Sequence, residues 1–476
     1  MTTVLKPDIC VIGAGSGGLS VAAAAAAFGV SVVLIEKGKM GGDCLNYGCV
    51  PSKAMIAAGK QAEAMRHASA FGIADVDPQV DFKAVNRHVR SVIAAIAPND
   101  SVERFTALGV QVIQAEARFA DARTVAAAEY EIRARRFVVA TGSSALVPPI
   151  PGLNTVDYLT NETIFEQSRK PRRLIIVGGG PIGMELAQAH RRLGAEVVVV
   201  EAFSVLGKDD PEAAALVIDR LRSEGVDIRE NTKVVAVERR GKTGVRVQVE
   251  TADGEPDTID GTHLLVAVGR AANVDGLGLD AAGIEHDRKG IKVDAKLRTS
   301  NRRAYAIGDV AGGLQFTHVA GYHAGLVIRS MLFRLPARED RSIIPWVTYT
   351  DPELAQVGLS EAEARKAGRD FRILRWPYAE NDRAQAERKT SGFIKLIADK
   401  RGRLLGVTIV GANAGEMINF WALALTKGLK LRDVTAYVPP YPTMSEIGKR
   451  AAIAFFSPAT RKLWVRRLIA FLRLFG

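Results

Sequence analysis

"DICVIGAGSGGLSVAAAAAAFGVSVVLIE", residues 8–36, decides the fold expected for this chain of 476 residues. An apolar run leads into the pattern G-x-G-x-x-G at Gly13, Gly15 and Gly18, and a second apolar run ends at Glu36. This order predicts a strand, a tight turn, a helix and a second strand. In such a unit the first glycine permits the turn, the second lets the backbone approach a pyrophosphate, and the third packs the helix on the strand.

The same pattern recurs in "RLIIVGGGPIGMELAQAHRRLGAEVVVVE", residues 173–201. In both copies the terminal glutamate stands 23 positions after the first glycine. That glutamate accepts hydrogen bonds from a ribose, and the N–H groups at the helix start hold a diphosphate. One copy alone would also fit an ordinary tight turn, but two matched copies predict two dinucleotide sites. The residues of the second site are Gly178, Gly180, Gly183 and Glu201.

The second site is expected to prefer NADH over NADPH. A 2′-phosphate would meet the carboxylate of Glu201. No arginine follows that residue closely, and the first downstream cation is Lys208. Pro181 fits the first position of the helix, where no N–H is required.

The composition indicates a soluble, cytoplasmic protein with a large buried core and two to four domains. Hydrophobic residues make up 47% of the chain, and the three cysteines are too few for a secreted disulfide framework. The longest apolar run, residues 19–30, is too short to span a bilayer. Nucleic-acid binding would need a clustered basic stripe interleaved with aromatics, and the net charge of +12 includes only one basic cluster of that density, at the C-terminus, so we expect no nucleic-acid binding.

Two of the cysteines, Cys44 and Cys49, lie close together in "GGDCLNYGCVPSK", residues 41–53. A disulfide between them would close a small ring, and in a cytosolic protein such a bridge is more often catalytic than structural. A zinc site would require another Cys or His pair at metal spacing, so no metal site is expected. Two inert buried thiols fit poorly beside Gly42, Asp43, Asn46 and Gly48. The stretch therefore predicts a redox-active pair.

A helix is expected over residues 50–65, directly after Cys49. Lys53 lies four residues beyond Cys49 and thus on the same helical face. Its ammonium group would favour the thiolate over the thiol. The alternative for Lys53 is an ordinary solvated lysine.

These features resemble the class I pyridine nucleotide-disulfide oxidoreductases, which include dihydrolipoamide dehydrogenases, glutathione reductases and mercuric reductases. The resemblance extends to about residue 456 and includes "VVATGS" (138–143), "VAVGR" (266–270), "YAIGDV" (305–310) and "VTYTDPELAQVG" (347–358). It implies an α/β fold with two doubly wound, Rossmann-like dinucleotide-binding domains and an α+β dimerisation domain, in a homodimer. The expected domains are 1–150 with 270–343 for FAD, 151–269 for NAD(P), 344–456 for dimerisation, and a basic amphipathic tail at 457–476.

The resemblance also implies a path for electrons, from NADH through FAD at the first glycine motif to a Cys44–Cys49 disulfide. Cys49 would be the flavin-facing thiol and Cys44 the interchange thiol. Lys53 would lie at the flavin edge, paired with Glu185. The other cofactor residues implied by the family motifs are Gly42, Thr141, Gly142, Asp309 and His318 for FAD and Gly269 for NAD.

The resemblance implies a specific role for two of these residues. Asp309 would hold the ribityl chain of FAD. His318 would open a helix whose positive end points at the flavin. A general-base role for His318 is the weaker alternative, because a backbone N–H at that helix end suffices.

The chain departs from the family at the motif that supplies an acid–base histidine from the partner subunit. Members that use dithiols have His before Pro-Thr and a Glu four residues beyond that Pro. Here Tyr441 takes the place of the His, Glu446 remains, and no histidine follows His323. Because tyrosine is a poor base at neutral pH, Tyr441 weakens the case for a disulfide substrate. Tyr441 would complete the site of the other subunit.

A small-molecule or metal-ion acceptor is therefore expected. Mercuric reductases also carry Tyr in this region, so a mercuric reductase-like activity leads and a dihydrolipoamide dehydrogenase-like activity is the runner-up. Mercuric reductases usually add a C-terminal Cys pair, whereas this sequence ends "FLRLFG".

The last stretch, "SPATRKLWVRRLIAFLRLFG", predicts a helix that starts at Ser457-Pro458. One side would carry Lys462, Arg466 and Arg473, and the other would be a broad apolar face. The residues of that face are Trp464, Leu468, Phe471, Leu472 and Phe475. This pattern is typical of a basic helix on an anionic membrane surface, and the alternative is a terminal helix packed on its own domain or on the dimer partner. If the tail docks, the protein is peripheral at the inner membrane face and a quinone or protein partner becomes a candidate acceptor.

Overall fold

The computed structural model describes residues 2–242 and 244–475 and divides into two compact units. The first unit holds the chain up to Gly179 together with Ala189–Ala202 and Asn231–Glu339. The second unit holds Gly180–Gln188, Phe203–Glu230 and the chain from Asp340 onward. Each unit is described by itself.

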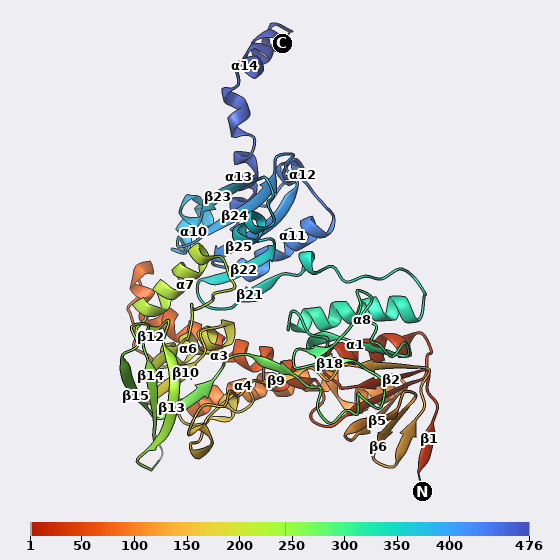
Figure 1. Ribbon diagram of the computed structural model, residues 1–476. Helices are drawn as coiled ribbons and strands as arrows, with labels where there is room; N and C mark the ends of the chain where they lie inside the picture. Colours follow the sequence, from red (N-terminus) through yellow and green to blue (C-terminus); the bar gives the residue numbers. More distant parts are fainter. Residues whose placement is uncertain (1, 243, 476) are drawn as a thin grey trace. The chain divides into compact units, whose positions relative to one another are not determined.

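The first glycine motif forms the centre of a five-stranded parallel sheet in the first unit (Figure 1). The motif supplies β2 (Ile9–Ile12), α1 (Ser16–Ala27) and β3 (Val32–Glu36), and the strand runs are buried because helices or a second sheet cover both faces. In the order of the sheet, the strands are β20 (Ala304–Ala306), β8 (Arg136–Val139), β2, β3 and β4 (Val110–Gln114). Strand β20 thus returns to this sheet from far along the chain. Helix α1 packs beside α8 (Thr317–Met331).

A smaller four-stranded sheet covers the other face of the parallel sheet. Its order is β1 (Thr3–Leu5), β7 (Tyr130–Ile132), β6 (Thr124–Ala127) and β5 (Ala117–Asp121). The third cysteine, Cys10, is fully buried in the apolar core between them, beside Phe119 and Phe137. Burial raises the pKa of the Cys10 thiol, so this cysteine remains a core residue without a reactive thiolate.

The second glycine motif repeats this local structure. Strand β10 (Arg173–Val177) pairs in parallel with β11 (Glu196–Val200) and β16 (His263–Val266), and α6 (Pro181–Arg192) begins at Pro181. An antiparallel ribbon packs against these strands through Val237, Val247 and Ile259. It consists of β13 (Lys233–Arg240), β14 (Gly244–Glu250) and β15 (Pro256–Gly261).

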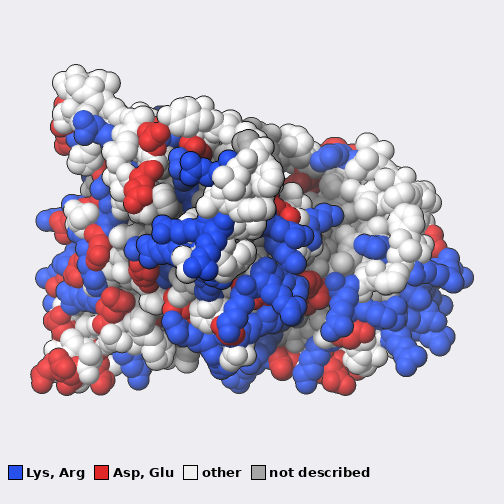
Figure 2. Space-filling view, turned by 90° about the horizontal axis from the view of Figure 1, so that it is seen from above, with Lys and Arg blue, Asp and Glu red and all other residues white. Residues whose placement is uncertain are grey.

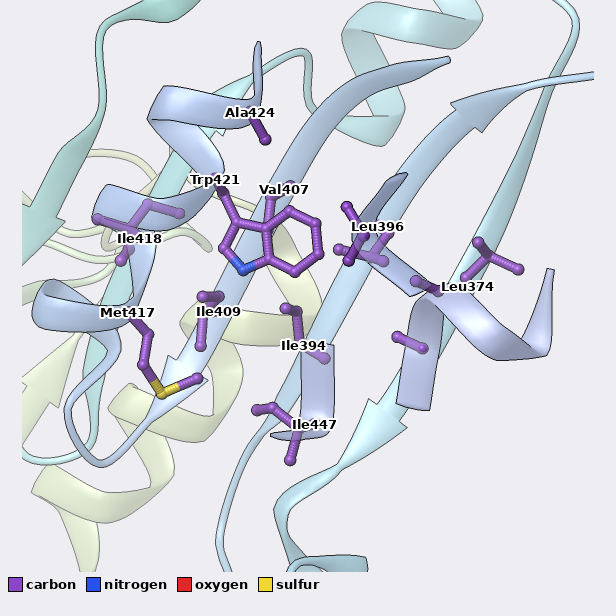
Figure 3. Close-up of a cluster of buried hydrophobic side chains, with 14 of the residues drawn as sticks. Leu374, Ile394, Leu396, Val407, Ile409, Met417, Ile418, Trp421, Ala424 and Ile447 are labelled. Carbon is purple, nitrogen blue, oxygen red and sulfur yellow. The ribbon is translucent and has the colours of Figure 1, made fainter. Parts of the chain in front are cut away.

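The second unit is built on a five-stranded antiparallel sheet. Its order is β21 (Trp346–Thr348), β22 (Glu353–Gly358), β25 (Leu404–Gly411), β24 (Phe393–Asp399) and β23 (Phe371–Pro377). Helices α11 (Ala414–Thr426) and α13 (Glu446–Ala454) pack on it around Trp421, as Figure 3 shows. A side chain at Gly448 would come within 2.5 Å of the Trp421 ring, so α13 can approach only because that residue is glycine.

The remaining helices lie around these sheets. In the first unit they are α2 (Gly42–Asn46), α3 (Cys49–Arg66), α4 (Phe82–Ile96) and α5 (Val102–Ala107). In the second unit they are α7 (Pro211–Ser223), α9 (Glu361–Lys366), α10 (Asp382–Ala386), α12 (Leu431–Ala436) and α14 (Leu463–Leu472). Among the residues that the structure describes, no helix has the length and apolar character needed to cross a membrane.

The tail helix starts later than the sequence predicted. Ser457–Arg461 forms a 3₁₀ turn instead of the first turn of an α-helix, and α14 begins only at Leu463. Lys462, between the two, has an extended backbone with φ −74° and ψ 125°, which ends the i→i+3 hydrogen bonding of the turn.

Candidate active site

The loop that carries the cysteine pair lies against the first glycine motif. The Gly41 N–H donates to the carbonyl oxygen of Ala14 at 3.0 Å. Gly41 and Gly42 both have positive φ, and a side chain at Gly42 would come within 2.8 Å of Gly15 Cα. Glycine is therefore required at Gly42 for this close approach. The contact places the start of α2 directly beside the expected pyrophosphate loop.

Cys44 and Cys49 are both free cysteines in this structure. Cys44 lies half-buried in α2, while Cys49 is exposed at the first residue of α3. Cys49 Sγ lies 3.4 Å from Thr317 Oγ1, at the first residue of α8. The N-terminal ends of two helices therefore flank the Cys49 sulfur, an arrangement that favours negative charge there.

The two thiols are strongly polarised. A hydrogen bond from the Cys44 thiol, supported by the Thr317 hydroxyl and the charge of Lys53, lowers the pKa of Cys49 to about 6. The same hydrogen bond, together with burial, raises the pKa of Cys44. At neutral pH Cys49 is therefore mostly thiolate and Cys44 remains a thiol.

A largely buried arginine, with 12% of its side chain exposed, joins the cysteine loop to the expected flavin motifs. Arg270 donates to Ser143 Oγ at 2.7 Å and to the Ser143 carbonyl oxygen at 2.6 Å, and its guanidinium lies 3.1 Å from Asp43 Oδ1. Asn161 Nδ2 donates to the same Asp43 oxygen at 3.0 Å. Ser143 Oγ in turn donates to Asp309 Oδ2 at 2.5 Å, and burial raises the pKa of Asp309. The residue next to Cys44 is thus fixed to two distant parts of the chain.

The two glycine motifs use their glutamates in the same way. The Ala14 N–H donates to Glu36 Oε2 at 2.6 Å, and the Gly179 N–H donates to Glu201 Oε2 at 2.7 Å. A carboxylate has room for further hydrogen bonds, so both glutamates can still accept from a ribose.

The glycines of the motifs fit dinucleotides. Gly13 and Gly178 have φ of 103° and 112°, and a side chain on either would overlap the carbonyl oxygen of a neighbouring strand. At Gly15 and Gly180, by contrast, a Cβ would meet no atom within 4 Å. Such open space beside backbone N–H groups is what a bound pyrophosphate requires. At Gly18 a Cβ would overlap the carbonyl oxygen of Gly13, so the helix packs closely there.

Four other predicted cofactor residues lie in the first unit. Thr141 Oγ1 donates to the carbonyl oxygen of Asn273 at 2.8 Å, and Gly142 and Gly269 both have positive φ. His318 is the second residue of α8, and its ring stacks on Phe316 with 5.3 Å between centroids. The sequence analysis named His318 but missed Thr317, which contacts the redox sulfur.

Of the remaining predicted residues, Glu185, Tyr441 and Glu446 lie in the second unit. Tyr441 is 70% exposed, and its hydroxyl donates to Asp382 Oδ2 at 3.0 Å, which raises the Tyr441 pKa. Glu446 begins α13. Lys53 belongs to the first unit and Glu185 to the second, so their pairing stays a prediction. Glu185 is buried and accepts a hydrogen bond from the Tyr349 N–H at 2.9 Å.

Two glycine motifs of the dinucleotide-binding kind, together with a polarised cysteine pair, are the features of a flavin-dependent disulfide reductase. The chain belongs to the pyridine nucleotide-disulphide oxidoreductase family, whose model matches residues 7–324, and the dimerisation domain of that family matches residues 344–452. Its members depend on FAD and take electrons from NAD(P)H. The dimerisation domain supports a homodimer.

Individual relatives have different activities. A mercuric reductase of Lysinibacillus sphaericus is 36% identical over 94% of this chain and 82% of its own length. A dihydrolipoyl dehydrogenase of Geobacillus stearothermophilus is 35% identical over 94% and 96%. Among solved structures, the Cu(II) complex of the HOCl-induced flavoprotein disulfide reductase RclA from Escherichia coli is similar, with a TM-score of 0.83 and 28% identity over 92% of this chain and 98% of that one.

Proposed function

We propose that this protein transfers electrons from NADH, through its cysteine pair, to a thiolate-binding metal ion. The observation that carries the proposal is Tyr441, whose hydroxyl is engaged by Asp382 at the position where dithiol-using members have an acid–base histidine. The residue roles and domain bounds predicted above belong to this proposal.

The bound FAD would supply hydride acceptance from NADH and two-electron transfer to the cysteine pair. Cys49 would hold the thiolate next to the flavin, with Thr317 and Lys53 stabilising its charge. Cys44 would meet the acceptor. Arg270 would keep Asp43, and therefore the loop at Cys44, in place.

Metal and disulfide acceptors make different demands on protons. Soft ions bind thiolates directly, and when one Hg(II) ion takes two electrons, or two Cu(II) ions take one electron each, the two sulfurs form their S–S bond without giving the product a proton. A disulfide acceptor instead releases thiolates that must be protonated, so its turnover gains from a group that titrates near neutral pH. Tyr441 cannot titrate there, because the hydrogen bond to Asp382 raises a pKa that is already high.

The relatives support two candidate metal acceptors. Mercuric reductases are among the similar proteins, and RclA has been solved as a Cu(II) complex. Hg(II) and Cu(II) are therefore the ions to test first. A dihydrolipoamide dehydrogenase-like activity is the alternative, supported by relatives of similar identity.

The preference for NADH rests on Glu201. Its carboxylate accepts from the Gly179 N–H, which supports a fixed negative charge at the end of the second strand, where the ribose of the proposed cofactor would bind. A Glu201→Gln variant keeps the shape and removes the charge. We expect the ratio of NADPH to NADH turnover to rise at least about fivefold in this variant, because like-charge repulsion is lost.

A turnover panel tests the proposal as a whole. The natural protein would be assayed with NADH and NADPH against Hg(II), Cu(II), lipoamide, glutathione disulfide and a quinone. We expect metal reduction to exceed disulfide reduction, and Cys44→Ser and Cys49→Ser variants to lose it. Fast lipoamide turnover by the natural protein would refute the argument from Tyr441.

A second candidate is a membrane-docked electron carrier that reduces a quinone or a protein partner. The exposed apolar side chains of the C-terminal tail favour it. In the same panel, a quinone turnover above that of every metal ion and disulfide would support the membrane-docked electron carrier over metal reduction.

A further inference from the structure

The C-terminal tail, residues 457–475, is an amphipathic segment that leaves its apolar side uncovered. In Figure 1 it extends beyond α13 and away from the sheet of the second unit. No residue of the turn Ser457–Arg461 or of α14 is buried. Trp464 is 63% exposed and Phe475 is 74% exposed. Side chains of this size are normally covered in a monomeric soluble protein when they lie together.

Four of the large apolar side chains of α14 lie on one side. At 100° per residue, Trp464, Leu468, Phe471 and Leu472 fall within an arc of about 100°. The rings of Phe471 and Phe475 are in edge-to-face contact, with 5.1 Å between centroids, so Phe475 extends this apolar face into the last turn. A continuous apolar face therefore runs along the whole helix.

The charges of the tail all have one sign. The described tail carries Arg461, Lys462, Arg466, Arg467 and Arg473, and no acidic residue follows Glu446. Lys462, Arg466 and Arg473 lie opposite the apolar arc, and Arg467 borders it, where a long side chain can extend its charge to a polar surface. Elsewhere the surface also carries dense groups of Lys and Arg side chains (Figure 2).

We propose that the tail docks on an anionic lipid surface, with its apolar face among the acyl chains and its cations at the headgroups. A helix of this kind lies in the plane of the interface, which agrees with the length of α14, since it has only 10 residues. Charge complementarity selects this occupant. An anionic bilayer attracts each cation of the tail, whereas the tail of a second copy brings the same cations and no acidic residue.

Vesicle flotation of the flavin-loaded, full-length protein tests the proposal. We expect flotation with vesicles of phosphatidylcholine and phosphatidylglycerol, none with phosphatidylcholine alone, and release at high salt. An Arg466→Gln/Arg473→Gln variant should bind the anionic vesicles about thirtyfold more weakly, because each surface cation contributes about 1 kcal/mol.

Two further variants separate the apolar face from exposure in general. Trp464→Ser/Phe471→Ser removes two rings of the face and should weaken vesicle binding at least about tenfold. Ile469→Ser is the control, because Ile469 is 53% exposed but lies on the side of the cations. It should change binding less than about threefold.

Several results would overturn the proposal. One is the absence of flotation on anionic vesicles, and another is an equal loss of vesicle binding in the Ile469→Ser control and in the Trp464→Ser/Phe471→Ser variant. A third is a Trp464→Ser/Phe471→Ser variant that dissociates the dimer and leaves flotation unchanged, which would assign the tail to the subunit interface. A duplex DNA gel shift without flotation would assign it to nucleic acid. Turnover of water-soluble acceptors should be the same in all variants, so the membrane proposal and the proposed function can fail independently.

Discussion

Replacing Thr317 by Val should raise the pKa of Cys49. Valine keeps the shape of threonine but removes the hydroxyl that lies 3.4 Å from Cys49 Sγ. Hydrogen bonds to charged groups contribute about 1.5–3 kcal/mol, and the lower end applies because the Cys44 thiol shares the same charge. Since about 1.4 kcal/mol equals one pKa unit, the pKa should move from about 6 to about 7.

The direction follows from which form the hydroxyl stabilises. The donor favours the thiolate, so its removal makes deprotonation harder and shifts the titration to higher pH. At neutral pH the thiolate fraction of Cys49 should fall from about nine-tenths to about one half. The thiol of Cys10 does not interfere, because burial raises its pKa.

With Cys49 placed beside the flavin as proposed, its thiolate would produce a long-wavelength absorbance with oxidised flavin, from which the pKa can be read. The flavin-loaded protein, reduced by two electrons without oxygen, would be titrated with pH. Alkylation rates of the Cys49 peptide provide a second measurement. Thr317→Ser keeps the hydroxyl and should titrate within about 0.3 units of the natural protein. If the Val and Ser variants titrate alike, the hydroxyl does not stabilise the thiolate and the reasoning is wrong.

Three further pairs of substitutions test other parts of the site. A Gly15→Ala variant should fold normally, because its Cβ meets no atom within 4 Å, but it should not bind FAD. A Gly13→Ala variant should fail to fold, because its Cβ would overlap a neighbouring strand. Circular dichroism measures folding and flavin absorbance measures bound FAD, so the two variants can be distinguished. Arg270→Met should lower the free energy of unfolding by about 3 kcal/mol in chemical denaturation, since two carboxylates lose their buried partner. The control Arg133→Met, at an exposed ion pair, should cost less than about 0.5 kcal/mol. Tyr441→His should raise lipoamide turnover about tenfold or more while Tyr441→Phe leaves it unchanged, because only the histidine titrates near neutral pH; equal rates would show that the position is not in the proton path.

The parts of the fold that depend on local backbone geometry could be predicted from the sequence. Each glycine motif was expected to give strand, turn and helix, and each does, because Gly13 and Gly178 adopt positive φ and allow the close approach of a neighbouring strand. The helix after Cys49 was expected for the same kind of reason and extends from Cys49 to Arg66. The tail helix was predicted too early, because proline is equally compatible with a 3₁₀ turn.

The partners of the cysteine pair could not be predicted in this way. Thr317 stands 268 residues from Cys49, and Arg270 stands 127 residues from Ser143. Arg270 ends the family motif "VAVGR", but nothing in that motif indicates that its side chain reaches Ser143 and Asp43. Thr317 has no local signal that distinguishes it from an ordinary polar residue.

By itself, the sequence determined that two dinucleotide motifs and a redox pair are present, since spacing within a motif fixes which atoms of one segment can meet. Only the tertiary structure decided which distant side chains stabilise the Cys49 thiolate and hold Asp43. The physical reason is that β8 and β20 pair in the parallel sheet although they come from distant parts of the sequence. The helices and loops that follow such parallel strands meet at one edge of the sheet. Contacts made at that edge depend on the order of the strands, which no short motif contains.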